Sequence, residues 1–105
     1  MQPAVFRMRI QPGMEDVYRQ RHEAVWPEVE AALRRVGFSR YSIFAAGTEL
    51  VAYFEAVDPP ATLARLAEEP VMQRWWAWMA PVMGDEPADA HDYVRVYHLD
   101  DPREE

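Results

Sequence analysis

The 105-residue sequence contains no cysteine. Disulfide bonds, thiolate nucleophiles and cysteine-ligated metals are therefore excluded, and the chain is compatible with the reducing cytoplasm, where we expect the protein to act. Only four glycines are present, too few for a glycine-rich loop that would hold phosphate groups. The three histidines, His22, His91 and His98, are scattered without the spacing of paired metal ligands, so no metal site is predicted.

Positive charge is also scarce, because 18 acidic residues outnumber 11 basic ones and give a formal net charge of −7. A protein of this charge lacks the basic surface that nucleic acids and anionic membranes require, so neither is an expected partner. The apolar run at the start of the chain includes Arg7 and Arg9, which fits neither a signal peptide nor a membrane span. The length predicts a single domain, residues 1–105, whose charged end, 100–105, is frayed.

Alternating apolar and polar residues predict four strands, over residues 4–11, 39–46, 49–57 and 92–99. Helical periodicity predicts one long helix over residues 14–36, with a kink or restart at Pro27, whose ring clashes with the preceding turn. Gly37 is a candidate C-cap for this helix. A short helix is expected at about 60–68, and Pro70 begins a further helix that ends near Pro81.

This order, β-α-β-β-α-β with the second helix split in two, is typical of a ferredoxin-like α+β fold. It predicts a four-stranded antiparallel sheet with helices on one face. The opposite face would carry aromatic and charged side chains, namely Arg7, Arg9, Tyr53, Glu55, Tyr93, Arg95 and Tyr97. Such a face is too aromatic for simple exposure to solvent, so we interpret it as the contact surface of a homodimer, of the dimeric α/β-barrel type.

Tyr18 and His22 stand one turn apart in the apolar stripe of the long predicted helix. A single histidine in such a stripe is more often a core residue that is hydrogen-bonded to a backbone carbonyl. Here Pro27 bends the helix and frees nearby carbonyls, which favours a cavity rather than tight packing. Since an unperturbed imidazole has a pKa of about 6.5, His22 is a candidate acid–base group near neutral pH.

Two adjacent tryptophans, Trp75 and Trp76, occur in the last predicted helix, while Trp78 points elsewhere. Neighbouring helical residues point about 100° apart, so both indoles face inward only across a wide apolar stripe. The pair is either core packing or a set of aromatic plates for a ligand with apolar faces and hydroxyl groups, such as a sugar. Tyr41, on the second predicted strand, is an ordinary strand aromatic unless its hydroxyl reaches the same pocket.

Three segments together resemble the L-rhamnose mutarotase family. They are Tyr18-Arg19-Gln20-Arg21-His22 with the following Trp26-Pro27-Glu28-Val29-Glu30, then Tyr41-Ser42-Ile43, and then Gln73-Arg74-Trp75-Trp76-Ala77-Trp78-Met79. The resemblance implies a ferredoxin-like dimeric isomerase that interconverts the α and β anomers of L-rhamnose. It also implies that His22 is the catalytic proton donor and that four residues bind the sugar, namely Tyr18, Tyr41, Trp75 and Trp76. The loop at residues 84–92 departs from the family pattern.

Mutarotation delivers a proton to the ring oxygen and removes one from the anomeric hydroxyl; the ring opens, the C1–C2 bond rotates and the ring closes. No metal or cofactor is required, and one positioned acid–base group contributes about 10²–10⁴-fold. The partner base is open between Tyr18, Tyr41 and water. Together with the acidic balance and the apolar plates, the family resemblance implies a neutral 6-deoxyhexose as substrate, L-rhamnose before L-fucose. Two other functions fit the same pocket: a ferredoxin-like dimeric monooxygenase with His22 as base, and a ligand-binding module without activity.

Overall fold

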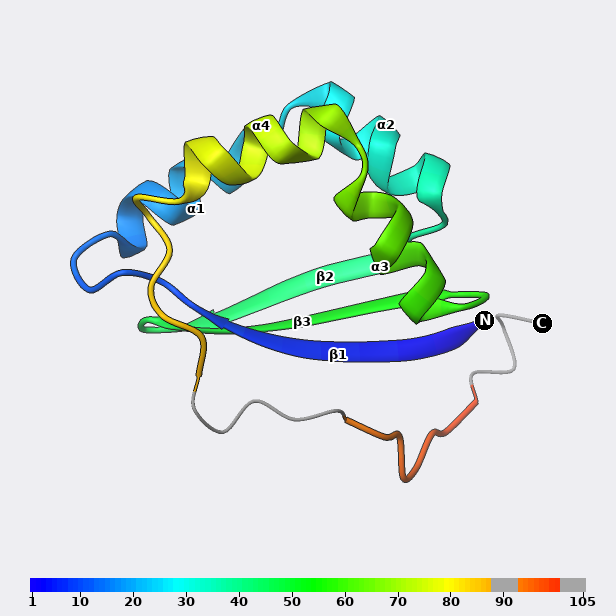
Figure 1. The fold of residues 1–105 in the computed structure, drawn as a ribbon. Coiled ribbons are helices and arrows are strands. Elements are labelled where there is room, and N and C mark those ends of the chain that lie inside the picture. Colours follow the sequence, from blue (N-terminus) through cyan, green and yellow to red (C-terminus); the bar gives the residue numbers. More distant parts are fainter. Residues whose placement is uncertain (88–92, 101–105) are drawn as a thin grey trace.

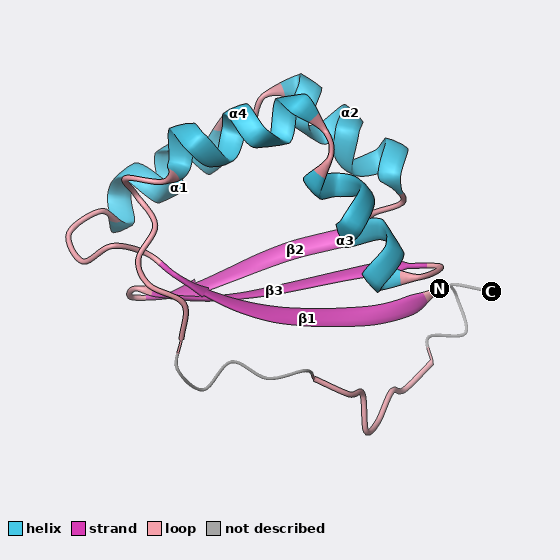
Figure 2. Cartoon of the chain, in the orientation of Figure 1, coloured by secondary structure: helices cyan, strands magenta, loops and turns pink. Residues whose placement is uncertain are grey.

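The computed structural model describes residues 1–87 and 93–100. Its elements are, in chain order, β1 (Gln2–Arg9), α1 (Glu15–Glu23), α2 (Pro27–Val36), β2 (Ser39–Ala46), β3 (Glu49–Ala56), α3 (Pro59–Ala67) and α4 (Pro70–Met79). In Figure 1 the helices arch over one face of the sheet, while residues 93–100 pass along the other face. Figure 2 shows these two layers by type of secondary structure, with residues 93–100 drawn as loop on the side opposite to the helices. The predicted placement of helices on a single face is confirmed.

The sheet that the described residues form has three antiparallel strands in the order β1-β3-β2. The central strand β3 pairs with β1 from Ala56↔Gln2 to Glu49↔Arg9, and with β2 through a tight turn at Gly47. Residues of β3 alternate strictly, so Leu50, Ala52 and Phe54 are buried beneath the helices. Tyr53 and Glu55 lie on the other face, as the sequence predicts.

A β-bulge interrupts β2 near its start. Ser39 pairs with Glu55 and Ser42 with Tyr53, so three steps along β2 oppose two steps along β3. Arg40, at a φ of 50°, absorbs the extra residue. Beyond the bulge the strand alternates normally, so Tyr41 and Ile43 face the helices while Ser42 faces away from them. The bulge changes the direction only of Ser39, which faces away from the helices although it lies two positions before Tyr41.

The predicted four-stranded sheet is not confirmed. Residues 93–100 have no regular secondary structure and are exposed, and position 92 lies outside the described residues, as do 88–91 of the 84–92 loop and 101–105 of the tail. Arg95 ties the segment to the sheet through a 2.7 Å hydrogen bond from Nη2 to the hydroxyl oxygen of Tyr53. The Tyr53 hydroxyl in turn donates to Glu55 at 2.6 Å. Alternation favours an extended chain, but a strand also needs a neighbouring backbone to pair with.

Proline and glycine set the ends of the helices. The long predicted helix is divided, since α1 ends at Glu23 and α2 begins at Pro27, where the missing N–H costs nothing. Gly37 closes α2 with a left-handed φ of 108°, as predicted. Prolines also begin α3 and α4, which lie within a residue or two of their predicted bounds. These local signals fix the helical layer that covers the sheet.

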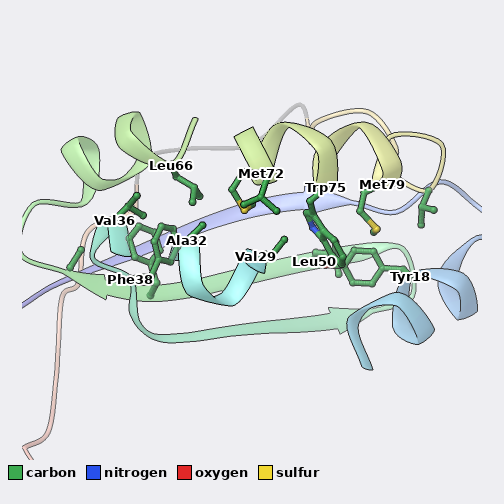
Figure 3. Packing of buried hydrophobic residues seen from close by; sticks show 14 of the residues in the cluster. Tyr18, Val29, Ala32, Val36, Phe38, Leu50, Leu66, Met72, Trp75 and Met79 are labelled. Atoms are coloured by element: carbon green, nitrogen blue, oxygen red, sulfur yellow. The ribbon is translucent and has the colours of Figure 1, made fainter. Parts of the chain in front are cut away.

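The hydrophobic core lies between the helices and the sheet (Figure 3). At one end of this layer Phe38 lies beneath Val36 and Leu66, and its ring stacks on that of Phe54 at 4.1 Å. At the other end, Figure 3 shows Trp75 pointing from α4 toward Leu50 and Tyr18. The candidate site lies at this second end, where the aromatic residues of α1 and α4 meet the sheet.

Candidate active site

Two cavities flank the inner face of α1. Their volumes are about 530 Å³ and 580 Å³, and they share three lining residues, Tyr18, His22 and Ile43. The smaller lies between α1 and the β2–β3 turn at Gly47, and its polar lining comes from Glu15, Arg19 and Glu23. The larger lies beneath α4 and is mostly apolar, with Phe6, Met8, Val25, Leu33, Met72, Met79 and Met83 among its walls. His22 therefore stands at the junction of a polar and an apolar space.

The imidazole of His22 is held by its neighbours on two sides. Its Nδ1 lies 3.1 Å from the backbone carbonyl oxygen of Tyr18, so the Nδ1–H donates there and Nε2 is left as the acceptor. The ring of Tyr18 stacks on it at 4.1 Å, and Trp75 meets it edge-on at 5.6 Å. These contacts fix both the tautomer and the plane of the ring.

Burial lowers the pKa of His22 from its usual value of 6.5, and the hydrogen bond to the Tyr18 carbonyl opposes this shift only in part. The imidazole is therefore neutral at neutral pH, with an unprotonated Nε2. At neutral pH such a histidine is present in the form that can accept a proton, and once charged it gives the proton up readily. That is the behaviour required of a group that both removes and returns protons.

Tyr18 and Tyr41 both line the larger cavity. Burial raises the pKa of Tyr18 to about 12, and burial together with the nearby Tyr18 raises the pKa of Tyr41 as well. Within residues 1–87 and 93–100, neither hydroxyl bonds to another protein group, and no buried side-chain polar atom lacks a partner. Neither hydroxyl is therefore sealed in the core, and both residues line the larger cavity, which is compatible with Tyr41 as part of the site.

The adjacent tryptophans have different environments. Trp75 is only 6% exposed and packs edge-on against Trp26 at 5.1 Å, so it belongs to the core as well as to the cavity wall. Trp76 is 43% exposed and also lines the larger cavity. Trp78 lines neither cavity, in agreement with its predicted direction, yet it packs against Trp26 and Trp75. The core interpretation thus holds for Trp75, whereas the interpretation of Trp76 as a plate for a ligand stays a prediction.

The structure adds lining residues that the sequence did not single out. Phe6 and Met8 form part of the floor, and their alternation along β1 does indicate that they face the helices. Glu30 supplies a carboxylate to the wall of the larger cavity from α2. Nothing in the local pattern pairs these positions with His22, because they come together only through the packing of separate elements.

Ligating side chains do not gather around His22. Among the residues that the structure describes, no group of three or more His, Asp or Glu side chains is placed to hold a metal ion. His98 lies on the 93–100 segment, which passes on the opposite side of the sheet from α1 (Figure 1), and His91 is outside the described residues. Catalysis without metal or cofactor stays a prediction. In the same described part of the chain, no helix has the length and apolarity needed to cross a membrane.

Solved structures identify the class of fold first. A dimeric ferredoxin-like protein from an uncultured marine organism matches with a TM-score of 0.57 and 12% identity, covering 94% of this chain and 96% of the other. SnoaB, a cofactor-independent oxygenase from Streptomyces nogalater, matches with a TM-score of 0.59 and 17% identity, covering 94% and 96% of the two chains. At these identities the matches establish a ferredoxin-like α+β fold.

Closer relatives narrow the class to sugar isomerases. The structure of an L-rhamnose mutarotase from Formosa agariphila matches with a TM-score of 0.78 and 26% identity, covering 95% of this chain and 100% of the other. The L-rhamnose mutarotase of Burkholderia orbicola (strain MC0-3) is 46% identical over 89 residues, 83% of this chain and 85% of the relative. Residues 4–99 match the L-rhamnose mutarotase family itself, so the chain belongs to that family.

Proposed function

We propose that this protein interconverts the α and β anomers of L-rhamnose and that His22 is its acid–base group. One observation carries the assignment of His22: its Nδ1 is occupied by the Tyr18 carbonyl, so Nε2 is the nitrogen available to a ligand in the cavities. Anomer interconversion is the activity of the family to which the chain belongs. The lowered pKa of His22 supports the same role, because the neutral ring is ready to accept a proton.

In the proposed reaction, Nε2 of His22 takes the proton of the anomeric hydroxyl as the C1–O5 bond breaks and the C1–O1 double bond forms. A second group gives its proton to O5, and after rotation about C1–C2 both protons return by the reverse path. His22 is thus the proton donor during ring closure. Tyr18, with its pKa raised to about 12, does not supply a free phenolate at neutral pH. Tyr18, Tyr41 or a water molecule would fill the second role by donating its own proton to O5 on ring opening and taking that proton back from the O5 hydroxyl on ring closure.

The lining of the cavities supports a 6-deoxyhexose as substrate. The apolar walls beneath α4, with Trp76 partly open to solvent, suit the methyl group and the C–H face of such a sugar. The hydroxyls of Tyr18 and Tyr41, and the polar residues beside α1, suit its hydroxyl groups. We propose that Tyr18, Tyr41, Trp75 and Trp76 contact the sugar, and that L-rhamnose is preferred to L-fucose.

Saturation-transfer NMR tests this proposal directly. Irradiating the anomeric proton of one L-rhamnose anomer should reduce the signal of the other within seconds when protein is present, and far less when it is absent. L-Fucose and D-glucose serve as comparison sugars, with slower exchange expected for both. An L-rhamnose exchange rate equal to that of the protein-free sample would overturn the proposal and leave a binding module or another enzyme of the same fold.

We also propose that two copies form a homodimer through the sheet face opposite to the helices. On this face Phe44 is 65% exposed and its pairing partner Val51 is 39% exposed. Val96, on the neighbouring extended segment, is 96% exposed. Covering these apolar side chains would stabilise an assembly. In such a dimer, residues 92–99 would gain the neighbouring backbone that the predicted fourth strand requires.

The cellular location is a further proposal. We propose that the protein works in the cytoplasm, because its cysteine-free chain has no need of an oxidising compartment. Immunodetection in separated cytoplasmic and envelope fractions tests this, and recovery in the envelope fraction would contradict it.

A further inference from the structure

The position of His22 depends on how α1 is attached to the rest of the molecule. This helix has nine residues, no side-chain cap at Met14 before its start, and no left-handed residue at Ala24 after its end. So short a helix is not stable in isolation, and its placement is set by tertiary contacts. The contacts that hold α1 therefore also hold the imidazole.

The C-terminal end of α4 offers one such contact. Val82 N–H would continue the helix by bonding to the carbonyl of Trp78, but it donates to Met79 instead, at 2.8 Å. The carbonyl of Trp78 is thus one of the carbonyls that a helix end leaves for other donors. Arg21 fills this place from α1, with Nη1 donating to the Trp78 oxygen at 2.6 Å.

The same guanidinium also lies on the indole of Trp78, with its Cζ 3.9 Å from the ring centre. A planar guanidinium can stack and donate at once, whereas a lysine ammonium cannot reproduce both contacts. Trp78 in turn packs against Trp75 at 5.4 Å, and Trp75 meets His22 edge-on at 5.6 Å. Arg21 thus connects α1 with the aromatic cluster that borders the imidazole.

We infer that Arg21 is a positioning residue, which docks α1 on the end of α4 and so holds the His22 imidazole against Trp75. The inference rests on the proposed function for its effect on turnover, although the docking itself does not. Without this contact, α1 would be packed less tightly on α4. The imidazole would then adopt other orientations and be more exposed to water. Misplacing a catalytic group by about 1 Å costs up to roughly 10²-fold in rate.

The test compares Arg21→Ala and Arg21→Lys with wild type. We expect kcat for anomer exchange to fall roughly ten- to a hundredfold in Arg21→Ala while KM rises less. Arg21→Lys keeps the charge but not the planar stack, so its kcat should lie between those of wild type and Arg21→Ala. Arg35→Lys is the matched control, because Arg35 joins α2 to Glu69 through hydrogen bonds of 2.9 and 2.8 Å away from both cavities. It should keep the wild-type rate.

A second readout does not depend on activity. NMR titration of the His22 ring protons in the sugar-free protein should show an upward shift of its pKa in Arg21→Lys, because looser docking lets water reach the ring. The charged and titratable groups around the ring are Tyr18 and, across the two cavities, Glu15, Arg19, Glu23, Glu30 and Tyr41. All of them stay unchanged in this variant, and the charge at position 21 is kept.

The outcomes separate the two proposals. Wild-type kcat together with a wild-type His22 titration in Arg21→Lys and Arg21→Ala would overturn the positioning role. If Arg21→Ala fails to fold by circular dichroism, the decision rests on Arg21→Lys alone, by the same criteria. If wild type does not exchange anomers, the proposed function fails, whereas the His22 titration still decides whether Arg21 holds the ring.

Discussion

At the scale of single residues, the useful property of His22 is that it is buried enough to lose its charge but still lines two cavities. Its hydrogen bond runs to the carbonyl four residues earlier in its own helix, so the tautomer does not depend on any distant partner. Substitution of His22 should therefore separate chemistry from folding.

We predict that His22→Asn removes most of the catalysed exchange, a loss of about 10²–10⁴-fold, because a single acid–base group contributes that much. The asparagine amide retains a donor for the Tyr18 carbonyl, so the fold should survive. Saturation-transfer NMR measures the rate, and circular dichroism checks the fold. Exchange at the wild-type rate would mean that His22 is only a packing residue.

The pH dependence follows from the direction of the pKa shift. Since the folded-state pKa of His22 lies below 6.5, the neutral form persists at pH 6.5, and catalysed exchange should decline only as the pH falls through that lower value. The unfolded chain protonates first, so the contribution of His22 to stability is complete above about pH 6.5 and is lost as the pH falls toward the folded-state pKa. Urea unfolding between pH 7.5 and 5 should show this loss in wild type but not in His22→Asn.

The tryptophan pair allows a further test. We predict that Trp76→Phe lowers the affinity for L-rhamnose with little loss of stability, because Trp76 is partly exposed at the cavity. Trp75→Ala, by contrast, should cost about 3–5 kcal/mol of unfolding free energy, as for other buried aromatic residues. Urea unfolding and fluorescence titration with L-rhamnose measure both effects. Equal sugar affinity in wild type and Trp76→Phe would remove Trp76 from the site.

Much of this site could be predicted from the sequence, and its limits have a physical cause. Local helical patterns single out the candidates: His22 is a polar residue in the apolar stripe that includes Tyr18, and Trp75 and Trp76 are adjacent on another helix. Their roles are implied by the resemblance to the family. The role of Arg21 could not be found in this way, because its partner Trp78 lies 57 positions further along the chain. Alternation with Ser42 gives the direction of Tyr41, but its proximity to His22 depends on how α1 packs on the sheet, which strand alternation does not reveal.

At the scale of elements, prolines and glycines were reliable guides, while strand alternation was not sufficient. Pro27 divides α1 from α2 and Gly37 ends α2 as predicted, since both act on the backbone of their own turn. Residues 92–99 alternate as clearly as the true strands. The described part of this segment nevertheless forms no strand, because pairing depends on a neighbouring backbone that alternation does not specify.

The approach of α3 to the end of α2 yields a prediction about glycine. Gly37 has a φ of 108°, and a Cβ there would lie 3.2 Å from Thr62 Oγ1. Gly13 has a φ of 89°, but a Cβ there would meet no atom within 4 Å. Gly13→Ala should therefore lower the free energy of unfolding by about 1–2 kcal/mol, from backbone strain alone. Gly37→Ala should lower it by clearly more, because strain and the close contact with Thr62 add. Urea unfolding of both variants checks this order. An equal loss of unfolding free energy would show that the Thr62 side chain moves away from the new Cβ at no cost.

At the scale of the whole molecule, we propose that the exposed sheet face is the contact surface of a homodimer. We predict that light scattering at micromolar concentration gives twice the chain mass of 12.2 kDa. Val51→Glu should shift this to the single-chain mass, because it puts a charge into the proposed contact. Leu63→Glu on α3 is the matched control, with 41% exposure against 39% for Val51, and should remain dimeric. A wild-type mass near 12.2 kDa would refute the dimer.

The indoles of Trp26, Trp75 and Trp78 have centres 5.1 to 5.4 Å apart and planes inclined at 30° to 84° to one another. Chromophores this close, held at fixed and unequal angles, couple their electronic transitions, and coupled transitions in a chiral array produce an exciton couplet in circular dichroism. Trp26 belongs to the turn between α1 and α2, whereas the other two belong to α4. The circular dichroism of the three indoles therefore reports how the α1–α2 turn packs against α4, without any added label.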